Sequence, residues 1–437
     1  MKLETARGMR DISPEEEMIR EDIISKFTKI FTSYGFVPLN TPIIERYDVL
    51  SAKFAAGEES DAMSETYRLK DNGKRELGLR FDLTVPLSRY VGMNRTMKMP
   101  FKRYQIGKVF RDAPIKHGRF REFTQCDVDI VGSKKQISDA TCIEIGLKVY
   151  DSINLPVKIL VNNRKFLVEL LEHYGIKKEN SDSIIMSIDK LDKIGKEGVL
   201  EEIETKGFDS SKINPVLDLI LSSKGSNDEK INSFKSTLGE TEGLKELKEV
   251  LDYFEGNEKV VFEPTLARGL GYYTGTIFEV EAEDKSVGSI GGGGRYDKMI
   301  DSYLSEGKQV ENPRFPAVGI SFGLDRIVEV LKKLNLVEQK TTKTDLLIVP
   351  MKTEKECFEI ASKIRSAGIN VDIDLMGRNL GKNFSNADEL KIPFVAVVGE
   401  NELKENKISI KNLSTGEKNL ATVDEVIELI NNNKQQN

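Results

Sequence analysis

Apolar side chains near the N-terminus recur every three or four residues, which is the spacing of one face of an α-helix. The positions that follow this spacing are Ile19, Ile23, Phe27, Ile30 and Phe31. Ser13 and Pro14 precede them, and a serine followed by proline and glutamates is a typical helix start. The pattern predicts a long amphipathic helix that ends near Tyr34 and Gly35.

The next apolar runs have the features of β-structure. Residues 35–45 (GFVPLNTPIIE) contain two prolines, which favours an edge strand because proline has no N–H to donate to a sheet. Residues 77–131 are strand-like and rich in turns. Within them, RYQIGKVFRD (103–112) and FTQCDVDIVG (123–132) flank a basic stretch. We expect these two segments to be the arms of a hairpin.

The pattern changes between residues 156 and 258, where charged residues, serine and glycine surround helical periods such as VLDLILSS. Strand patterns return at 276–283 (TIFEVEAE), at 289–297 (SIGGGGRYD) and at 317–331, where AVGISFG leads into a helical segment. A Lys/Thr-rich joint follows at 332–344, and strand and helix patterns alternate beyond it.

These patterns predict an α+β protein with four segments. Residues 1–155 and 259–335 are expected to form the two parts of one core. Residues 156–258 are expected to be a helical insertion, and residues 344–437 a separate α/β domain.

The composition is typical of a soluble protein of enzyme size. Of the 437 residues, 39% are hydrophobic and 31% are charged. This length predicts two or three domains. The net charge of −6 argues against unselective coating of nucleic acid, although a local basic groove on such a protein can still bind RNA.

The sequence contains no targeting or metal pattern. The N-terminus lacks the apolar core of a signal peptide, and no apolar run reaches the roughly 18 residues of a membrane span. The three cysteines are widely spaced, and only two histidines could join them as zinc ligands. We expect a reduced, cytoplasmic protein without membrane segments or structural zinc.

One basic stretch stands out from this acidic background. Five cations fall within 14 positions, namely Lys108, Arg111, Lys116, Arg119 and Arg121. An arginine such as Arg111 can bind phosphate oxygens through two parallel hydrogen bonds, and the loop cations can contact further phosphates. Phe123 offers a face on which a purine could stack. The alternative is a solvated basic turn.

Other motifs narrow the chemistry. The four glycines at 291–294 are followed by Arg295 and Tyr296 and not by the Lys-Ser/Thr of a P-loop, so they indicate a strand that passes close to a ligand or another backbone. Nucleophilic catalysis with an imidazole base has only His117 and His173 to use. Phosphate chemistry carried by arginines and magnesium is therefore favoured.

Two further segments each carry an arginine. ARGLGYYTG (267–275) places Arg268 ahead of two tyrosines, and GLDRI (323–327) places Arg326 in the first turn of a predicted helix. Taken alone, the first could be a pair of core tyrosines beside a salt-bridged arginine, and the second an ordinary helix start.

Taken together and in this order, the motifs resemble those of the class II aminoacyl-tRNA synthetases, and specifically the histidyl-tRNA synthetase family. GFVPLNTPIIE resembles motif 1, VFRDAPIKHGRFREFTQCDVDI (109–130) resembles motif 2, and AVGISFGLDRI (317–327) resembles motif 3. LARGLGYYTGTIFEV (266–280) and SIGGGGRYD resemble the two histidine-specific signatures. The resemblance covers essentially the whole chain.

The resemblance implies a fold and a reaction. The fold would be a class II catalytic core on a mostly antiparallel sheet with flanking helices, a helical insertion, and a C-terminal anticodon-binding domain. The reaction would join histidine to ATP, accompanied by Mg²⁺, as histidyl-adenylate with release of pyrophosphate. The histidyl group would then pass to the 3′ end of tRNA(His). Motif 1 implies a homodimer, because in this class it lies at the subunit interface.

The resemblance also assigns roles to single residues. Arg111 would bind the α-phosphate, Phe123 would pack on the adenine, and Arg326 would lie on the other side of the nucleotide. Asp82 and Thr84 would bind the α-amino group of histidine. The remaining pocket residues would be Gln125, Asp129, Arg268, Tyr272 and Tyr273. A guanidinium placed at the α-phosphate meets the charge that develops there, and we expect Arg268 to be the main electrostatic catalyst.

One position departs from the family pattern. The signature usually reads R-G-L-D-Y-Y, and Gly271 replaces its aspartate here, which puts the ordering of the tyrosine pair in question. Two other functions remain as alternatives: a regulatory subunit built on the same core without catalysis, and an RNA-binding module. In the terminal domain, Arg378, Lys382 and Lys391 are candidate phosphate contacts.

Overall fold

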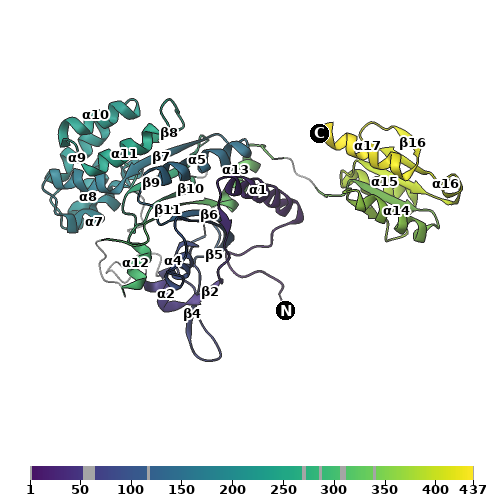
Figure 1. Ribbon diagram of the computed structural model, residues 1–437, viewed down its shortest axis with the longest axis horizontal. Helices are drawn as coiled ribbons and strands as arrows, with labels where there is room; N and C mark the ends of the chain where they lie inside the picture. The colour runs from purple at the N-terminus through teal and green to yellow at the C-terminus, as the bar shows by residue number, and fades with distance from the viewer. Residues whose placement is uncertain are drawn as a thin grey trace. The chain divides into compact units, whose positions relative to one another are not determined.

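The computed structural model describes residues 2–52, 64–115, 119–267, 272–284, 288–305, 312–337 and 341–436. The chain divides into two compact units, one of residues 1–11 and 20–337 and one of residues 12–19 and 338–437 (Figure 1). Among the described residues, no helix is long and apolar enough to cross a membrane.

An eight-stranded sheet forms the centre of the larger unit. Its spatial order is β1 (Val37–Pro38), β5 (Phe101–Phe110), β6 (Glu122–Val131), β11 (Ala317–Gly323), β10 (Ser289–Arg295), β9 (Thr276–Ala282), β7 (Val157–Asn163) and β8 (Val260–Phe262). The inner pairs are antiparallel, and the two edge pairs, β1 with β5 and β7 with β8, are parallel. The mostly antiparallel sheet is therefore confirmed, as is the hairpin of β5 and β6.

Two helices cover one face of this sheet. Helix α1 (Pro14–Ser33) begins where the sequence predicts, and the Ser13 hydroxyl accepts a hydrogen bond of 3.4 Å from the amide of Glu16. The rings of Phe27 on α1 and Tyr150 on α5 (Ile137–Ser152) lie 5.7 and 5.8 Å from the ring of Phe322 on β11. Because side chains alternate along a strand, the neighbours of Phe322 face the opposite side, which carries the candidate site.

One segment of the region 77–131, which the sequence predicts to be strand-like, forms a helix instead. Residues 84–93 form helix α4 (Thr84–Met93), and Asp82 Oδ1 accepts a hydrogen bond of 2.9 Å from the amide of Val85 at its start. A carboxylate that satisfies a first-turn amide favours helix initiation. The surrounding strands β2 (Ile44–Arg46), β4 (Glu76–Leu79) and β3 (Arg68–Lys70) form a separate three-stranded sheet next to α2 (Tyr47–Ala52).

The helical insertion contains α6 to α11 and lies at one end of the large sheet (Figure 1). The helices are α6 (Arg164–His173), α7 (Lys178–Ile188), α8 (Leu191–Thr205), α9 (Ser210–Ser222), α10 (Asn227–Leu238) and α11 (Glu242–Asp252). The segment before them, which the sequence analysis assigns to the insertion, is strand β7 of the large sheet. The short apolar run PVKILVNN joins the sheet between β9 and β8, and its alternate residues Ile159 and Val161 are buried. Two further helices, α12 (Met299–Leu304) and α13 (Leu324–Lys333), complete the larger unit.

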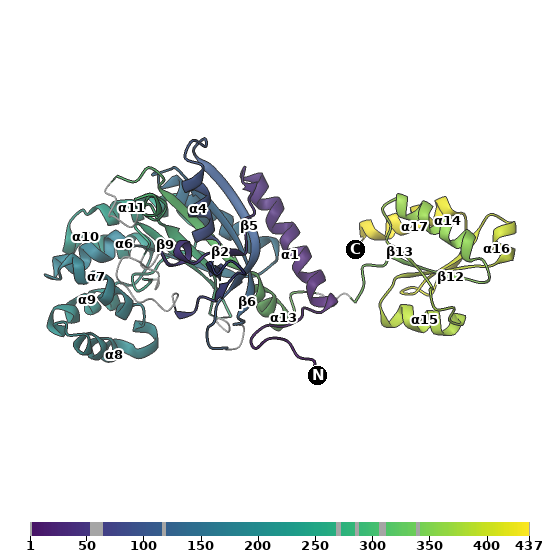
Figure 2. The ribbon, with the colours of Figure 1, turned by 90° about the horizontal axis from the view of Figure 1, so that it is seen from below.

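The C-terminal unit is a five-stranded sheet with helices on both faces. The strand order is β13 (Val371–Ile373), β12 (Leu346–Pro350), β14 (Phe394–Val398), β15 (Ile408–Asn412) and β16 (Lys418–Ala421). Figure 2 shows α14 (Glu354–Ser366) and α17 (Val423–Gln436) on one face and α15 (Leu380–Glu389) on the other. The helix α16 (Glu400–Lys404) follows β14. Separate apolar clusters fill the two interfaces, so this unit has its own core.

Candidate active site

A pocket of about 280 Å³ opens on the face of the large sheet that α1 and α5 leave uncovered. It collects side chains from the β5–β6 hairpin, from β10 and β11, and from the start of α13. Its lining includes Glu65, Arg111, Arg119, Phe120, Phe123, Gln125, Gly291, Gly292, Ser321, Asp325 and Arg326. Four residues selected from the sequence, Arg111, Phe123, Gln125 and Arg326, therefore meet in one cavity.

Three guanidinium groups give this pocket its charge. Burial lowers the pKa of Arg326, and the neighbouring charges of Arg119 and Arg111 lower it further. Burial also lowers the pKa of Arg111, although nearby carboxylates, first Asp82, oppose this change. Arginine remains protonated at neutral pH. Three cations held close together in a partly buried pocket are suited to a polyanion such as a triphosphate.

Arg111 is held between two aromatic rings. Its guanidinium carbon lies 4.2 Å from the ring centroid of Phe81 and 5.1 Å from that of Phe123. Stacking of this kind leaves the N–H groups at the edge of the guanidinium plane available for hydrogen bonds. The rings therefore restrict the orientation of the guanidinium while its donors remain directed to the side.

The rest of the basic stretch is divided between the pocket and the protein surface. Lys108 forms an ion pair with Glu122, and Arg121 forms one of 2.8 Å with Asp112. Neither residue lines the pocket, so the expectation that Arg121 contacts phosphates has no support in this geometry. Lys116 and His117 lie outside the described residues.

A row of polar side chains continues from the pocket along β6. Gln125, Asp127 and Asp129 lie on the same face of the strand because alternate residues share a face. Gln125 Nε2 donates to the hydroxyl of Ser321, 2.6 Å away. Asp129 is almost fully buried and is contacted by Arg103 at 2.7 Å and by the hydroxyl of Tyr296, which donates to it.

Asp127, between Gln125 and Asp129 on this face of β6, is a further candidate site residue that was not predicted from the sequence. It is 3% exposed, and none of the described residues makes a hydrogen bond to its Oδ1 atom. Burial raises the pKa of Asp127 to about 7; Arg103 opposes this effect and Asp129 adds to it. The alternation of polar residues at 125, 127 and 129 with Cys126 and Val128 indicates it, since a half-buried strand places such residues on one face.

Replacing Asp127 with asparagine is expected to change the pH dependence of stability. The pKa of Asp127 in the folded protein lies above its value of about 3.9 in an unfolded chain, so the folded state binds the extra proton between these values. The free energy of unfolding of the wild type should therefore fall as the pH rises through this window. Between about pH 5 and about pH 7.5, the wild type should lose roughly 2 kcal/mol more than Asp127→Asn. Urea unfolding at both pH values measures the free energy of unfolding of each protein. An equal change in this free energy between the two pH values for both proteins would contradict the prediction.

The glycines of β10 allow three strands to pack closely. A Cβ atom on Gly293 would lie 1.9 Å from the carbonyl oxygen of Gly319, and one on Gly294 would lie 2.6 Å from that of Thr276. Gly291 and Gly292 line the pocket itself. The close backbone approach expected for the glycine run is therefore present, and two glycines of the same strand lie on the pocket surface.

Three tyrosines form a cluster next to Asp129. The rings of Tyr272 and Tyr273 lie 4.6 Å apart, and the ring of Tyr296 is 6.1 Å from that of Tyr272 in an edge-on arrangement. Tyr273 is buried, and its ring would be met by a Cβ atom on Gly294. Arg268 and Gly271 lie outside the described residues.

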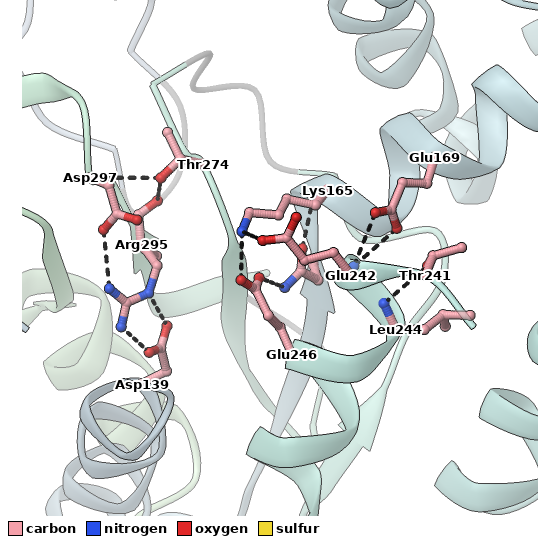
Figure 3. A network of polar contacts seen from close by, with 12 residues as sticks. Asp139, Lys165, Glu169, Thr241, Glu242, Leu244, Glu246, Thr274, Arg295 and Asp297 are labelled. Atoms are coloured by element: carbon pink, nitrogen blue, oxygen red, sulfur yellow. Dashed lines mark hydrogen bonds and ion pairs between the residues drawn. The ribbon is translucent and has the colours of Figure 1, made fainter. Parts of the chain in front are cut away.

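A buried arginine anchors the segments that carry these tyrosines (Figure 3). The guanidinium of Arg295 forms an ion pair with Asp139 on α5 and another of 3.1 Å with Asp297. The carbonyl oxygen of Arg295 accepts a hydrogen bond of 2.8 Å from the amide of Thr274, and the hydroxyl of Thr274 accepts one of 3.0 Å from the amide of Asp297. Tyr296 is thereby fixed next to the segment that follows Tyr273.

A second network in the same view holds the insertion together (Figure 3). Lys165 on α6 contacts Glu242 at 2.7 Å and Glu246 at 2.5 Å, both on α11. The carboxylate of Glu169 accepts hydrogen bonds from the amide of Gly243. These contacts join α6, which directly follows strand β7, to α11, which directly precedes strand β8.

Asp82 and Thr84 lie at the start of α4 and do not line the pocket. The charge of Asp82 nevertheless raises the pKa values of both Asp127 and Asp129, after the larger effect of burial. The residues that are expected to bind the nucleotide line the pocket, and Asp82, expected at the histidine site, lies close enough to the carboxylates of β6 to change their pKa values.

Comparison with known proteins identifies the family of this arrangement. Residues 8–327 match the family model of histidyl-tRNA synthetase. The chain belongs to the histidyl-tRNA synthetase family. Residues 345–433 separately match the model of an anticodon binding domain. The family and the class II fold that the sequence motifs indicate are thus confirmed.

Individual histidyl-tRNA synthetase relatives match over nearly the whole chain. Histidine–tRNA ligase 1 of Bacillus cereus is 38% identical over 424 residues, which cover 95% of this chain and 96% of the relative. Histidine–tRNA ligase of Phocaeicola vulgatus is 37% identical and covers 97% of this chain and 98% of its own length. The crystal structure of histidyl-tRNA synthetase from Nostoc sp. PCC 7120 has a TM-score of 0.85 at 30% identity and covers 99% of this chain and all of that one.

A further structure shares the synthetase fold alone. It is described as an ATP phosphoribosyltransferase regulatory subunit/histidyl-tRNA synthetase from Bacillus halodurans, with a TM-score of 0.72 and 23% identity. Here the separate anticodon-binding match is present at residues 345–433. The alternative of a regulatory subunit, which is expected to lack that domain, is therefore disfavoured.

Proposed function

We propose that this chain, as a member of the histidyl-tRNA synthetase family, is a histidine–tRNA ligase. It activates histidine with ATP to histidyl-adenylate and pyrophosphate, and it then transfers the histidyl group to the 3′ end of tRNA(His). The observation that carries this proposal is the convergence of Arg111, Arg119 and Arg326 on one pocket that continues into the polar face of β6. The pocket serves the ATP, and the polar face serves the amino acid.

In the nucleotide site, Arg111 binds the α-phosphate and Phe123 packs on the adenine. Arg326 lies across the pocket from the β5–β6 hairpin, and its Nη1 donates to the carbonyl oxygen of Ser289 at 2.5 Å. That bond leaves other guanidinium donors for the nucleotide, since arginine carries five N–H groups. Two arginines that approach from different elements can bind the phosphates from both sides.

In the histidine site, Asp82 and Thr84 serve the α-amino group, and Gln125, Asp129, Tyr272 and Tyr273 surround the side chain. Because Asp129 is already bound by Arg103 and by the Tyr296 hydroxyl, we propose that it also sets the orientation of that tyrosine. A buried polar pocket of this kind disfavours apolar amino acids, which would leave its polar groups unpaired. Arg268 is proposed as the main electrostatic catalyst from the sequence alone.

Magnesium fits this site as a companion of the ATP phosphates. Among the described residues, no group of three or more His, Cys, Asp or Glu side chains is placed to hold a metal ion. Magnesium commonly keeps several waters and is bound by substrate phosphates with one or two carboxylates. Glu65, which lines the pocket with Arg111, would supply such a carboxylate. The ion would neutralise charge on the departing pyrophosphate.

The C-terminal domain is proposed to recognise the anticodon end of tRNA(His), and the protein is proposed to act in the cytoplasm. The test of the proposed function is histidine-dependent exchange of pyrophosphate into ATP, followed by charging of tRNA(His) transcripts. Exchange that requires histidine and is not supported by other amino acids is expected. A purified protein without such exchange would refute the function.

A homodimer through the motif 1 segment is also proposed. Three apolar side chains there are exposed on the isolated chain: Val37 at 49%, Ile43 at 43% and Ile44 at 48%. Clustered exposed apolar residues of this kind mark association surfaces. Replacing Ile43 and Ile44 with glutamate should raise the dimer dissociation constant at least about 30-fold, because it buries unpaired charge in an interface. Analytical ultracentrifugation measures this change.

The control for the dimer is Leu221→Glu. Leu221 lies on α9 of the insertion and is 45% exposed, so it matches the exposure of the two isoleucines. This variant should keep the wild-type dissociation constant. If it dissociated as readily as the double variant, or if the double variant remained dimeric, the motif 1 interface would be wrong.

A further inference from the structure

A buried ion pair connects helix α1 with the wall of the nucleotide pocket. Asp325 immediately precedes Arg326 in the first turn of α13 and is 8% exposed. Its Oδ1 atom accepts a hydrogen bond of 2.8 Å from Nη1 of Arg20, which is 5% exposed. A second guanidinium, that of Arg10, approaches the same oxygen at 3.5 Å. The carboxylate beside Arg326 is therefore held from the N-terminal segment of the chain.

The same arginine also holds strand β6. Arg20 Nη2 donates to the hydroxyl of Thr124 at 2.7 Å, and the amide of Thr124 donates to Oδ2 of Asp325 at 2.8 Å. Arg20, Thr124 and Asp325 thus form a closed triangle of hydrogen bonds. Thr124 lies between Phe123 and Gln125, and both of these line the pocket. The triangle joins the back of β6 to the start of α13.

The two sides of the nucleotide pocket meet at this connection. Arg111 and Phe123 belong to the β5–β6 hairpin, and Arg326 belongs to α13. Strand β11, which leads into α13, pairs with β6 so that Gly323 lies opposite Gln125. The triangle adds directional side-chain bonds between β6 and the first turn of α13. A forked guanidinium can make both bonds at once, whereas the single ammonium of lysine can replace at most part of this geometry.

We infer that Arg20 is a positioning residue for the nucleotide site: through Asp325 and Thr124 it sets the spacing between Arg326 and the β5–β6 hairpin. Arg20 does not line the pocket, so it acts through residues that do. This inference rests on the proposed use of the pocket for ATP. It predicts a selective effect on ATP, because the triangle touches α13 and β6 at the nucleotide end of the site.

The test uses Arg20→Lys in the full-length protein. In histidine-dependent pyrophosphate exchange, kcat/KM for ATP should fall about 10- to 100-fold, as expected for removal of a hydrogen bond to a charged group. The KM for histidine should stay within about threefold of the wild-type value, because a threefold change is smaller than the loss of one hydrogen bond to a charged group would cause. The matched control is Arg164→Lys, because Arg164 is also buried and forms an ion pair of 2.6 Å with Asp182 in the insertion. It should leave both constants unchanged.

A second variant separates positioning from a loss of folding. Thr124→Val removes only the hydroxyl that Arg20 contacts, and it should lower kcat/KM for ATP in the same direction by roughly 3- to 10-fold, as for a neutral hydrogen bond. A kcat/KM for ATP equal to that of the wild type in folded Arg20→Lys and Thr124→Val would overturn the inference. So would equal increases in the KM values for ATP and histidine, which indicate a general loosening. If Arg20→Lys did not fold, Thr124→Val alone would decide between these outcomes.

A direct measurement of ATP binding separates the test of this inference from the test of the proposed function. Calorimetric titration with ATP alone measures the nucleotide site without any reaction. A wild type that binds ATP but shows no histidine-dependent exchange would refute the proposed function, while weaker ATP binding by Arg20→Lys would still support the positioning role. Unchanged ATP binding by the variant would overturn that role in either case.

Discussion

Replacement of Arg111 with alanine should lower the rate of histidyl-adenylate formation by about 10²- to 10³-fold. The guanidinium is held between the rings of Phe81 and Phe123 before any ligand arrives. A donor fixed in this way interacts with the developing charge on the α-phosphate without first reorganising, which is the source of its effect on the transition state. Rapid-quench measurement of the first turnover with ATP and histidine gives the rate directly.

Two further variants make this prediction specific. Arg111→Lys should recover only part of the rate, because lysine keeps the charge but lacks the planar fork. Lys108→Ala should change the rate by less than about threefold, since exposed ion pairs contribute little. Lys108 belongs to the same basic stretch, but it pairs with Glu122 and does not line the pocket. A normal rate of adenylate formation in Arg111→Ala would contradict the role, and so would an equal loss in Lys108→Ala.

Much of the fold could be predicted because its signals are local. The start of α1 depends on Ser13 and Pro14, and its end on Gly35, which adopts a φ of 78°. The β5–β6 hairpin and the strand of consecutive glycines are also visible as short apolar patterns. Helix α4 was missed because its start depends on Asp82, whose carboxylate accepts the amide of Val85. A strand-like composition gives no sign of that bond.

The candidate site could also be predicted only in part. The motifs place Arg111, Phe123, Gln125 and Arg326 in one pocket, as the structure shows. The sequence could not tell which cations of the basic stretch are already paired, because Glu122 and Asp112 meet Lys108 and Arg121 only in the folded hairpin. It also could not show that Asp129 is bound by Arg103 and Tyr296, which lie 26 residues before it and 167 residues after it in the chain. Partners of buried charges are a product of tertiary packing.

The C-terminal domain should control charging of tRNA without affecting activation of histidine. It has its own sheet and its own apolar clusters, so its surface can be changed without disturbing the larger unit. Three cations proposed as phosphate contacts are exposed on it, Arg378, Lys382 and Lys391. The loop before α15 is ordered by Asp374, whose carboxylate accepts hydrogen bonds from the amides of Met376 at 3.0 Å and Arg378 at 2.7 Å. That loop also exposes Leu375 and Met376, which offer apolar contact to unpaired bases.

Reversing the charge of all three cations to glutamate should lower kcat/KM for tRNA(His) by roughly 100-fold or more at low salt, because phosphate contacts supply much of the binding free energy of nucleic acids. The dependence of KM on salt should become shallower, by a slope of about 0.7 to 0.9 for each phosphate that the variant no longer neutralises. Histidine-dependent pyrophosphate exchange should remain within about twofold of the wild-type rate, since exposed substitutions outside a site rarely change the free energy by more than about ±0.5 kcal/mol.

The control reverses three exposed lysines of the same unit, Lys355, Lys404 and Lys418, which gives an identical change in net charge. If the control impaired charging as strongly, only the overall charge of the unit would matter. If exchange fell together with charging in the first variant, the separation of the two activities would be wrong.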